Sequence, residues 1–161
     1  MDIQALFGLG TLMSFVAFGI VTKLYFWPRI RMLPRENALA FLVVPHTFRF
    51  IGLSFLVPGV VSPSLPLAFA APAAYGDLVA AILAVAATLA LSRRASWAIL
   101  LVWLFNVWGT ADFLYAFYLG QFGVQIDPGA LGAAFFIPTV VVPPLFITHL
   151  LIFWLLLRSK K

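Results

Sequence analysis

Five long runs of apolar residues, separated by short polar connections, dominate this sequence. They cover about residues 3–27, 36–62, 66–91, 95–120 and 128–157. Each is at least as long as the roughly 20 apolar residues that an α-helix needs to cross the hydrocarbon core of a bilayer. Lipid offers the backbone no water to bond, so such runs are expected to fold as helices. The pattern predicts an all-α integral membrane protein with one transmembrane domain, residues 1–161, built as a compact five-helix bundle.

The composition agrees with this prediction. The chain is 64% hydrophobic and 9% charged, whereas a soluble domain is about half apolar and a quarter charged. Because the chain has no cysteine, disulfides, thiolate metal sites and cysteine nucleophiles are excluded. The start, MDIQALFGLG, has an acid at Asp2 and lacks the basic segment of a signal peptide. We therefore expect the first run to be retained as a span.

The net charge of +5 does not indicate nucleic-acid binding, because the basic residues lie at the ends of the apolar runs. They flank the first connection, the third connection and the C-terminal tail: Lys23, Arg29, Arg31, Arg35, Arg93, Arg94, Arg158, Lys160 and Lys161. The second and fourth connections have none. Basic residues favour the cytoplasmic side, so the pattern predicts a multi-pass protein of the cell (plasma or inner) membrane. Its N-terminus is then outside and its C-terminus cytoplasmic.

Two connections carry further information. The third, SRRAS, is so short that the runs 66–91 and 95–120 are expected to be antiparallel neighbours. The run 66–91 is rich in small residues, which lets neighbouring helices approach closely. At the fourth connection, Asp127 followed by Pro128 is typical of a helix start.

Five ionisable side chains and one asparagine lie deep inside the predicted spans. Such groups usually face the interior of a bundle. At about 1.5 Å of rise per residue, the two histidines share one depth and the other four lie slightly higher, around the midplane. We predict a ligand-binding site between the second, third, fourth and fifth helices, with no catalytic residue and no metal ligand. Its residues are His46, Arg49, Asp77, Asn106, Asp112 and His149.

Arg49 carries a permanent charge that must be paired within the membrane. Asp77 is the expected partner, because only a short loop joins their helices. Asp112 then needs a proton, a histidinium, a bound cation or water. It could be protonated and hydrogen-bonded, belong to a proton relay or hold a cation, and the sequence leaves these alternatives open. An ion pair that only locks the bundle together is the competing interpretation.

The fourth run carries polar residues on two faces. Asn106 and Thr110 are four residues apart and share a face, which favours hydrogen bonds to a neighbouring helix. Asp112 points about 120° away from Asn106, at 3.6 residues per turn, and aligns with Trp108 and Tyr115. The helix is therefore expected to be central, or to turn its second face towards another protomer.

Three prolines interrupt the fifth run, FFIPTVVVPPLFITHLL: Pro138, Pro143 and Pro144. Each lacks a backbone N–H and disturbs the preceding turn. Carbonyls around residues 137–140 then lose their usual partners and must be satisfied by neighbours, water or a ligand. Broken helices at this depth bind ions and substrates in transporters, while a plain kink is the simpler alternative.

The leading hypothesis is a small binding or transport protein for a small molecule, a proton or a cation. The equal depth of His46 and His149 raises an alternative, a b-type haem for electron transfer with both as axial ligands. A third is an architectural subunit without a ligand. No phosphate loop, HExxH pair or GxSxG elbow is present, so an enzyme is not favoured. The expected partners are the lipid bilayer, a small molecule or ion, and a second copy or partner subunit.

Overall fold

The computed structural model describes residues 2–158 and is almost entirely helical, with no β-strand in that range. Five helices are long and apolar enough to cross a membrane: Ile3–Ile30, Arg35–Leu56, Leu67–Ser92, Ala98–Gly123 and Ile137–Leu157. The prediction of an all-α chain with five apolar helices is confirmed. The limits of the second and fifth helices were predicted wrongly.

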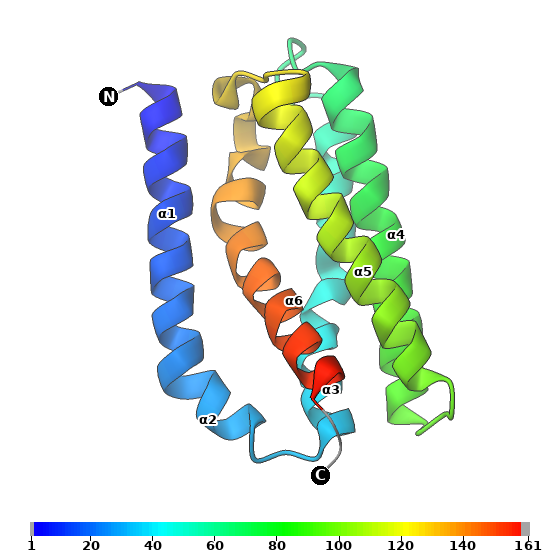
Figure 1. Cartoon of the computed structure of the whole chain (residues 1–161). Coiled ribbons are helices and arrows are strands. Elements are labelled where there is room, and N and C mark those ends of the chain that lie inside the picture. Colours follow the sequence, from blue (N-terminus) through cyan, green and yellow to red (C-terminus); the bar gives the residue numbers. More distant parts are fainter. Residues whose placement is uncertain (1, 159–161) are drawn as a thin grey trace.

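The five helices run alternately up and down (Figure 1). The third and fourth are α4 (Leu67–Ser92) and α5 (Ala98–Tyr118), the latter extended by a π-helical turn, Leu119–Gly123. These two pack against each other, as the short SRRAS connection predicts. Alanines make up most of the buried face of α4, which lets both α5 and the second helix approach it closely.

The second helix changes its winding part of the way along. It begins as α3 (Arg35–Val43) and continues as a 3₁₀-helix, η2 (Val44–Leu56). A 3₁₀-helix rises about 2.0 Å per residue and an α-helix about 1.5 Å, so these residues already span about 40 Å. The predicted helix 36–62 followed the apolar run and therefore extends six residues beyond Leu56, where the observed helix ends. Residues beyond Leu56 form turns instead.

The predicted fifth helix, 128–157, is in fact two segments. A short 3₁₀ segment, η4 (Pro128–Phe135), begins with the Asp127 carboxylate accepting from the Gly129 N–H at 2.9 Å. At Gly132 the backbone turns out of the helix with φ of 54°. Only glycine suits this position, because an added Cβ would collide with the Val60 carbonyl. The long helix follows as a π-helical turn, η5 (Ile137–Val141), and α6 (Val142–Leu157).

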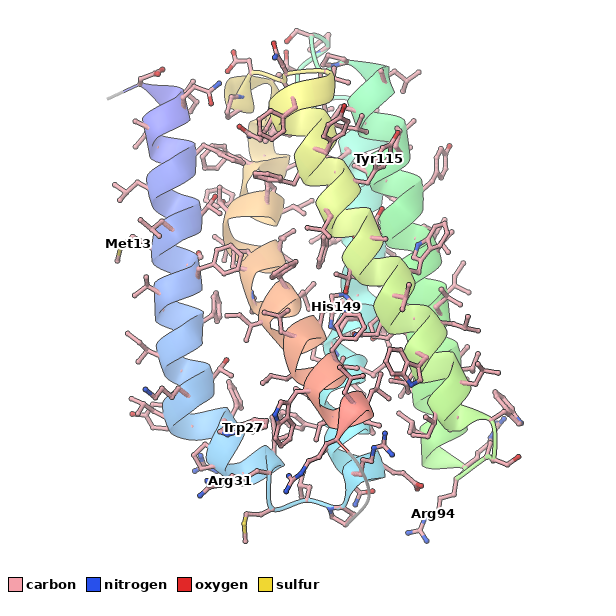
Figure 2. The ribbon with its side chains drawn as sticks, in the orientation of Figure 1. Met13, Trp27, Arg31, Arg94, Tyr115 and His149 are labelled. Atoms are coloured by element: carbon pink, nitrogen blue, oxygen red, sulfur yellow. The ribbon has the colours of Figure 1, made fainter. Side chains whose placement is uncertain are left out.

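The first helix is the most loosely attached of the five. It consists of α1 (Ile3–Val21), a π-helical turn, η1 (Thr22–Phe26), and the short α2 (Trp27–Ile30). No side chain of α1 is buried, and α1 contacts mainly α6 and η5. In Figure 1 it stands at the edge of the bundle, and in Figure 2 its Met13 points away from the other helices.

The buried side chains form two apolar cores at different heights in the bundle. One core includes Leu39, Val102 and Ile152. It lies towards the end that carries Arg31 and Arg94, labelled in Figure 2, which we call the basic end. The other core, which includes Phe69 and Leu131, lies towards the opposite end. Polar side chains occupy the space between the two cores.

Candidate functional site

The structure brings all six polar residues of the predicted site together between the two cores. We call this group the polar layer. Arg49, Asp77, His46, Asn106 and His149 are all buried, and the side chain of Asp112 is 8% exposed. His149 marks the layer midway along the bundle in Figure 2. The layer consists of His46 and Arg49 from η2, Asp77 from α4, Asn106 and Asp112 from α5, and His149 from α6.

The winding of η2 explains why its polar residues share one column. A 3₁₀-helix has three residues per turn, so side chains three apart are eclipsed. His46, Arg49, Gly52 and Phe55 follow this spacing and are the buried residues of η2. Runs of 3₁₀-helix longer than three or four residues are uncommon, and η2 has 13. The long 3₁₀ segment keeps His46 and Arg49 pointing inwards together.

Arg49 bridges both carboxylates. Its Nε donates to Asp77 Oδ1 at 2.7 Å, and its Nη2 donates to Asp112 Oδ2 at 2.6 Å. Nη1 donates to the Gly109 carbonyl at 3.1 Å, and the guanidinium carbon lies 3.6 Å from the centre of the Phe113 ring. The predicted pair between Arg49 and Asp77 is present. The expectation that Asp112 would then be left without this cation is wrong, because Arg49 bonds Asp112 as well. The planar guanidinium holds several donors at fixed angles and can reach both.

The hydrogen bonds of His149 show which of its two ring nitrogens carries the proton. Since an arginine can only donate, the contact of 3.2 Å between Arg49 Nη1 and His149 Nε2 makes Nε2 the acceptor. His149 Nδ1 therefore carries the proton and donates to Asn106 Oδ1 at 2.7 Å. Asn106 Nδ2 in turn donates to the His149 carbonyl at 3.3 Å. His149 is thus an uncharged ring that joins Arg49 to Asn106.

His46 is held by a hydrogen bond to Thr148 of α6. The Thr148 hydroxyl donates to the Leu145 carbonyl at 2.7 Å, so its oxygen accepts from His46 Nε2 at 2.8 Å. His46 Nδ1 is buried and has no hydrogen-bond partner among residues 2–158. The two levels predicted from the sequence are joined by hydrogen bonds, because Asn106 and Arg49 both bond directly to His149.

The two histidine rings do not fit a haem. Their centres lie 4.3 Å apart, and the ring of Phe105 packs against both, at 4.9 and 5.2 Å. Two axial ligands must face each other across the porphyrin plane, and here the rings contact each other directly. Both nitrogens of His149 are also already bonded to Arg49 and Asn106. In addition, no three acidic or histidine side chains among the described residues are placed to hold a metal ion.

Asp112 meets the rest of the layer despite its position on a second face of α5. Asp112 and Asn106 point about 120° apart around α5, and the Arg49 side chain is long enough to reach Asp112. Trp108, on the same face of α5 as Asp112, donates its Nε1–H to the Gly76 carbonyl of α4 at 3.2 Å and is 46% exposed. Thr110 bonds within its own helix, to the Asn106 carbonyl at 2.7 Å, rather than to a neighbour.

Three glycines make room for the polar layer. A Cβ on Gly52 would collide with the Asp77 carboxylate, and one on Gly76 with the Asp112 carboxylate. A Cβ on Gly109 would lie 2.7 Å from Arg49 Nη1. This role was not predicted from the sequence. The available signal was that each of these mid-helix glycines lies within three residues of a polar member of the layer.

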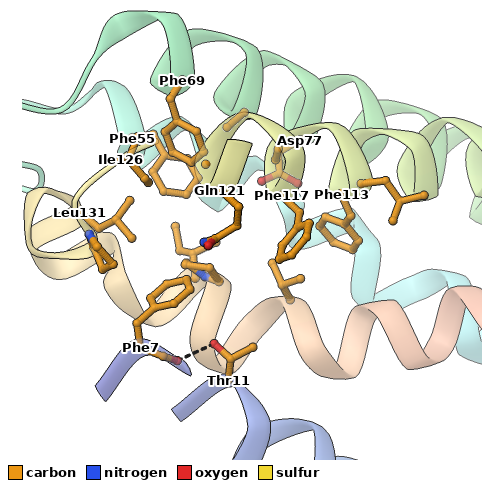
Figure 3. Close-up of a pocket in the computed structure, with 18 of the residues that line it drawn as sticks. Phe7, Thr11, Phe55, Phe69, Asp77, Phe113, Phe117, Gln121, Ile126 and Leu131 are labelled. Carbon is orange, nitrogen blue, oxygen red and sulfur yellow. Dashed lines mark hydrogen bonds between the residues drawn. The ribbon is translucent and has the colours of Figure 1, made fainter. Parts of the chain in front are cut away.

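A cavity of about 290 Å³ adjoins the carboxylate side of the polar layer (Figure 3). Asp77 and Asp112 line it, whereas Arg49 and the histidines do not. Its walls are otherwise almost entirely apolar. Phenylalanine is the commonest residue in them, at seven positions that were not predicted from the sequence: Phe7, Phe15, Phe55, Phe69, Phe113, Phe117 and Phe146. We call this space the phenylalanine cavity.

A second apolar cavity, of about 550 Å³, lies towards the basic end between α1–η1, η2 and α6. One face of the first helix lines both cavities, because residues spaced by three or four share a helix face. That face contributes Phe7, Thr11 and Phe15 to the phenylalanine cavity and Phe18, Thr22 and Phe26 to the second cavity. The first helix is therefore the wall common to both.

The proline-rich turn of the fifth helix lies where the two cavities adjoin. Ile137, Pro138 and Val142 line the phenylalanine cavity, while Val140 and Val141 line the second. The Ile137 carbonyl is satisfied by the Val142 N–H in a π-helical turn. Thr139 donates its hydroxyl to the Phe135 carbonyl at 2.8 Å. Part of the backbone disturbance predicted from the prolines is thus absorbed within the helix itself.

The amino-acid sequence matches a known protein family. Residues 6–157 match the model of a domain of unknown function, DUF8737. The chain belongs to this family. The match covers all five apolar helices almost completely, so the family corresponds to the bundle as a whole. No curated protein and no solved structure matches the chain.

Proposed function

We propose that this DUF8737 chain is a multi-pass protein of the cell membrane, with its N-terminus outside and its C-terminus in the cytoplasm. Five helices of membrane-spanning length and composition support this proposal. The basic residues of the first and third connections support the orientation, since basic loops favour the cytoplasmic side. Arg31 and Arg94 mark this end of the molecule in Figure 2.

We further propose that the protein binds a lipophilic small molecule in the phenylalanine cavity. One observation carries this proposal: a cavity of about 290 Å³ with apolar walls ends on two aspartates that belong to a buried polar network. Ligand sites are typically apolar concavities with a few placed polar groups. A bilayer-embedded cavity of this kind selects molecules that dissolve in lipid and present one polar group.

A purely architectural role explains less of the molecule. It accounts for the bridge from Arg49 to both aspartates, because a buried ion pair can hold helices together. It gives no reason for an apolar cavity that ends on two carboxylates. Binding of a ligand gives one, because a few placed polar groups in an apolar concavity are typical of a ligand site.

Binding is tested with the uncharged probe phenylbutanol and the protein purified in a neutral detergent. Isothermal titration calorimetry should detect saturable binding to the wild type. Ala116→Trp fills the cavity from α5 and should abolish it. The matched control is Ala111→Trp, on the exposed face of the same helix, which should bind normally. Absence of binding in the wild type, or equal binding in both tryptophan variants, would contradict the proposal.

Transport is a second candidate, favoured by two cavities that occupy opposite halves of the bundle and share the first helix as a wall. A ligand passing between them must pass the proline-rich turn of the fifth helix and slide along the first helix. The measurement is the flux of a ligand into proteoliposomes. If this flux stops in Asp112→Asn while the variant still binds phenylbutanol, the protein transports the ligand and does not only bind it.

A further inference from the structure

The charges of the polar layer do not balance. Arg49 is the single cation among its members and bonds two carboxylates, those of Asp77 and Asp112. His149 is uncharged because its Nε2 accepts from Arg49. A second proton on His46 would have no acceptor among residues 2–158, since Nδ1 is buried without a partner. With both aspartates ionised, the layer therefore carries one negative charge in excess.

This excess charge is presented to the phenylalanine cavity. The side chains of Asp77 and Asp112 are 9% and 8% exposed, and both line the cavity. The Arg49 side chain is 1% exposed and does not line it. With both aspartates ionised, the polar wall that a molecule in the cavity meets is anionic. An acid in the cavity would be repelled, and a neutral molecule would leave the charge uncompensated.

The other walls suit an organic cation rather than a metal ion. The faces of aromatic rings attract cations, most strongly where water is excluded. Figure 3 shows Phe113 and Phe117 next to Asp77 at this end of the cavity. Arg49 already lies over the ring of Phe113, while the side chain of Phe117 is 60% exposed. Hard metal cations prefer six or more oxygen ligands, and almost all of this lining is apolar.

We propose that the ligand of the phenylalanine cavity is a lipophilic organic cation, an amine with an apolar body. Its ammonium group contacts the Asp77 and Asp112 carboxylates and the ring of Phe117, and its apolar body lies among the remaining phenylalanines. This inference rests on the proposed function, because it names the class of molecule that the same cavity selects.

The experiment compares three probes of the same shape and different charge: phenylbutylamine, phenylbutanol and phenylbutanoate. Titration calorimetry of the detergent-purified wild type should show the amine binding at least about tenfold more tightly than the alcohol. The butanoate should bind most weakly. Asp112→Asn should remove the preference for the amine, and its binding of the alcohol would show that this variant is folded. Phe117→Leu keeps an apolar wall and should reduce the affinity for the amine more than that for the alcohol.

The outcomes separate this inference from the proposed function. If the wild type binds amine and alcohol equally, the cavity is a binding site and its selectivity for cations is refuted. If the preference for the amine survives in Asp112→Asn, the carboxylate assignment is overturned. If the wild type binds none of the three probes, both the proposed function and this inference fail.

Discussion

Arg49 connects more of the interior than any other residue described here. Its guanidinium contacts two carboxylates, a backbone carbonyl, a histidine and a phenylalanine ring, and these groups come from α4, α5 and α6. Lysine could not replace it, because an ammonium lacks the planar fork that reaches several acceptors at fixed angles. A single residue therefore joins these helices in the interior of the bundle.

Removing the arginine alone should be more harmful than removing the whole charged group. Arg49→Gln leaves two buried carboxylates unpaired and should cost about 3–5 kcal/mol of stability. The triple variant Arg49→Gln, Asp77→Asn and Asp112→Asn has no charge in the layer and should recover much of that loss. Unfolding of the detergent-purified variants measures both. A triple variant as unstable as Arg49→Gln would show that the charges are not the cause.

The glycines beside the polar layer should tolerate no side chain. Gly76→Ala places a methyl group on the Asp112 carboxylate and should destabilise the protein by about 1–3 kcal/mol, as overpacking does. Gly19→Ala is the matched control, because nothing lies within 4 Å of its added Cβ. It should be neutral or stabilising, by up to about 1 kcal/mol. Equal thermal shifts in the two variants would refute the role assigned to Gly76.

At the scale of elements, the second and fifth helices depart most from regular α-helix, and both face the site. The sequence analysis placed His46 and Arg49 on one face from their spacing of three. It did not identify the 3₁₀ winding, since the same spacing also fits one face of an α-helix. Gly132 was likewise overlooked, because the carbonyl that requires a glycine there belongs to Val60, about 70 residues earlier in the chain.

The contact between α1 and the fifth helix can be tested with a disulfide, because the chain has no native cysteine. A Cβ on Gly10 would lie 3.9 Å from the Cβ of Thr139, close to the mean disulfide separation of about 3.8 Å. Gly10→Cys with Thr139→Cys should therefore oxidise and resist a thiol-reactive polymer in a gel-shift assay. Gly8→Cys with Thr139→Cys is the control and should remain labelled. Labelling of both pairs would place α1 elsewhere.

At the scale of the whole molecule, the polar layer separates two apolar cores. The first helix lines two cavities, of which the phenylalanine cavity adjoins the polar layer. The cores hold the four inner helices together. The first helix has no buried side chain in α1 and adds mainly a wall to the cavities. Loosely packed elements open most readily, so the first helix is the natural route for a ligand entering from lipid.

The proposed orientation predicts opposite labelling of two connections. Ser64→Cys, in the exposed second connection, should react with a membrane-impermeant maleimide in intact cells. Ser96→Cys, in the exposed third connection beside Arg93 and Arg94, should react only after permeabilisation. Both changes are nearly isosteric, and the wild type, with no cysteine, is the blank. The reverse pattern would show that the topology is inverted. Labelling of both cysteine variants in intact cells would exclude the proposed topology.

The sequence by itself determined the five apolar helices and the six polar residues among them. Long apolar runs leave the backbone few alternatives to a helix, and polar side chains in such runs turn away from lipid. Only the tertiary structure decided that one arginine serves both aspartates and that the histidine rings are in contact. It also decided that the carboxylates, and not the guanidinium, face a cavity. These features depend on the reach of side chains from distant segments, which spacing along the chain does not specify.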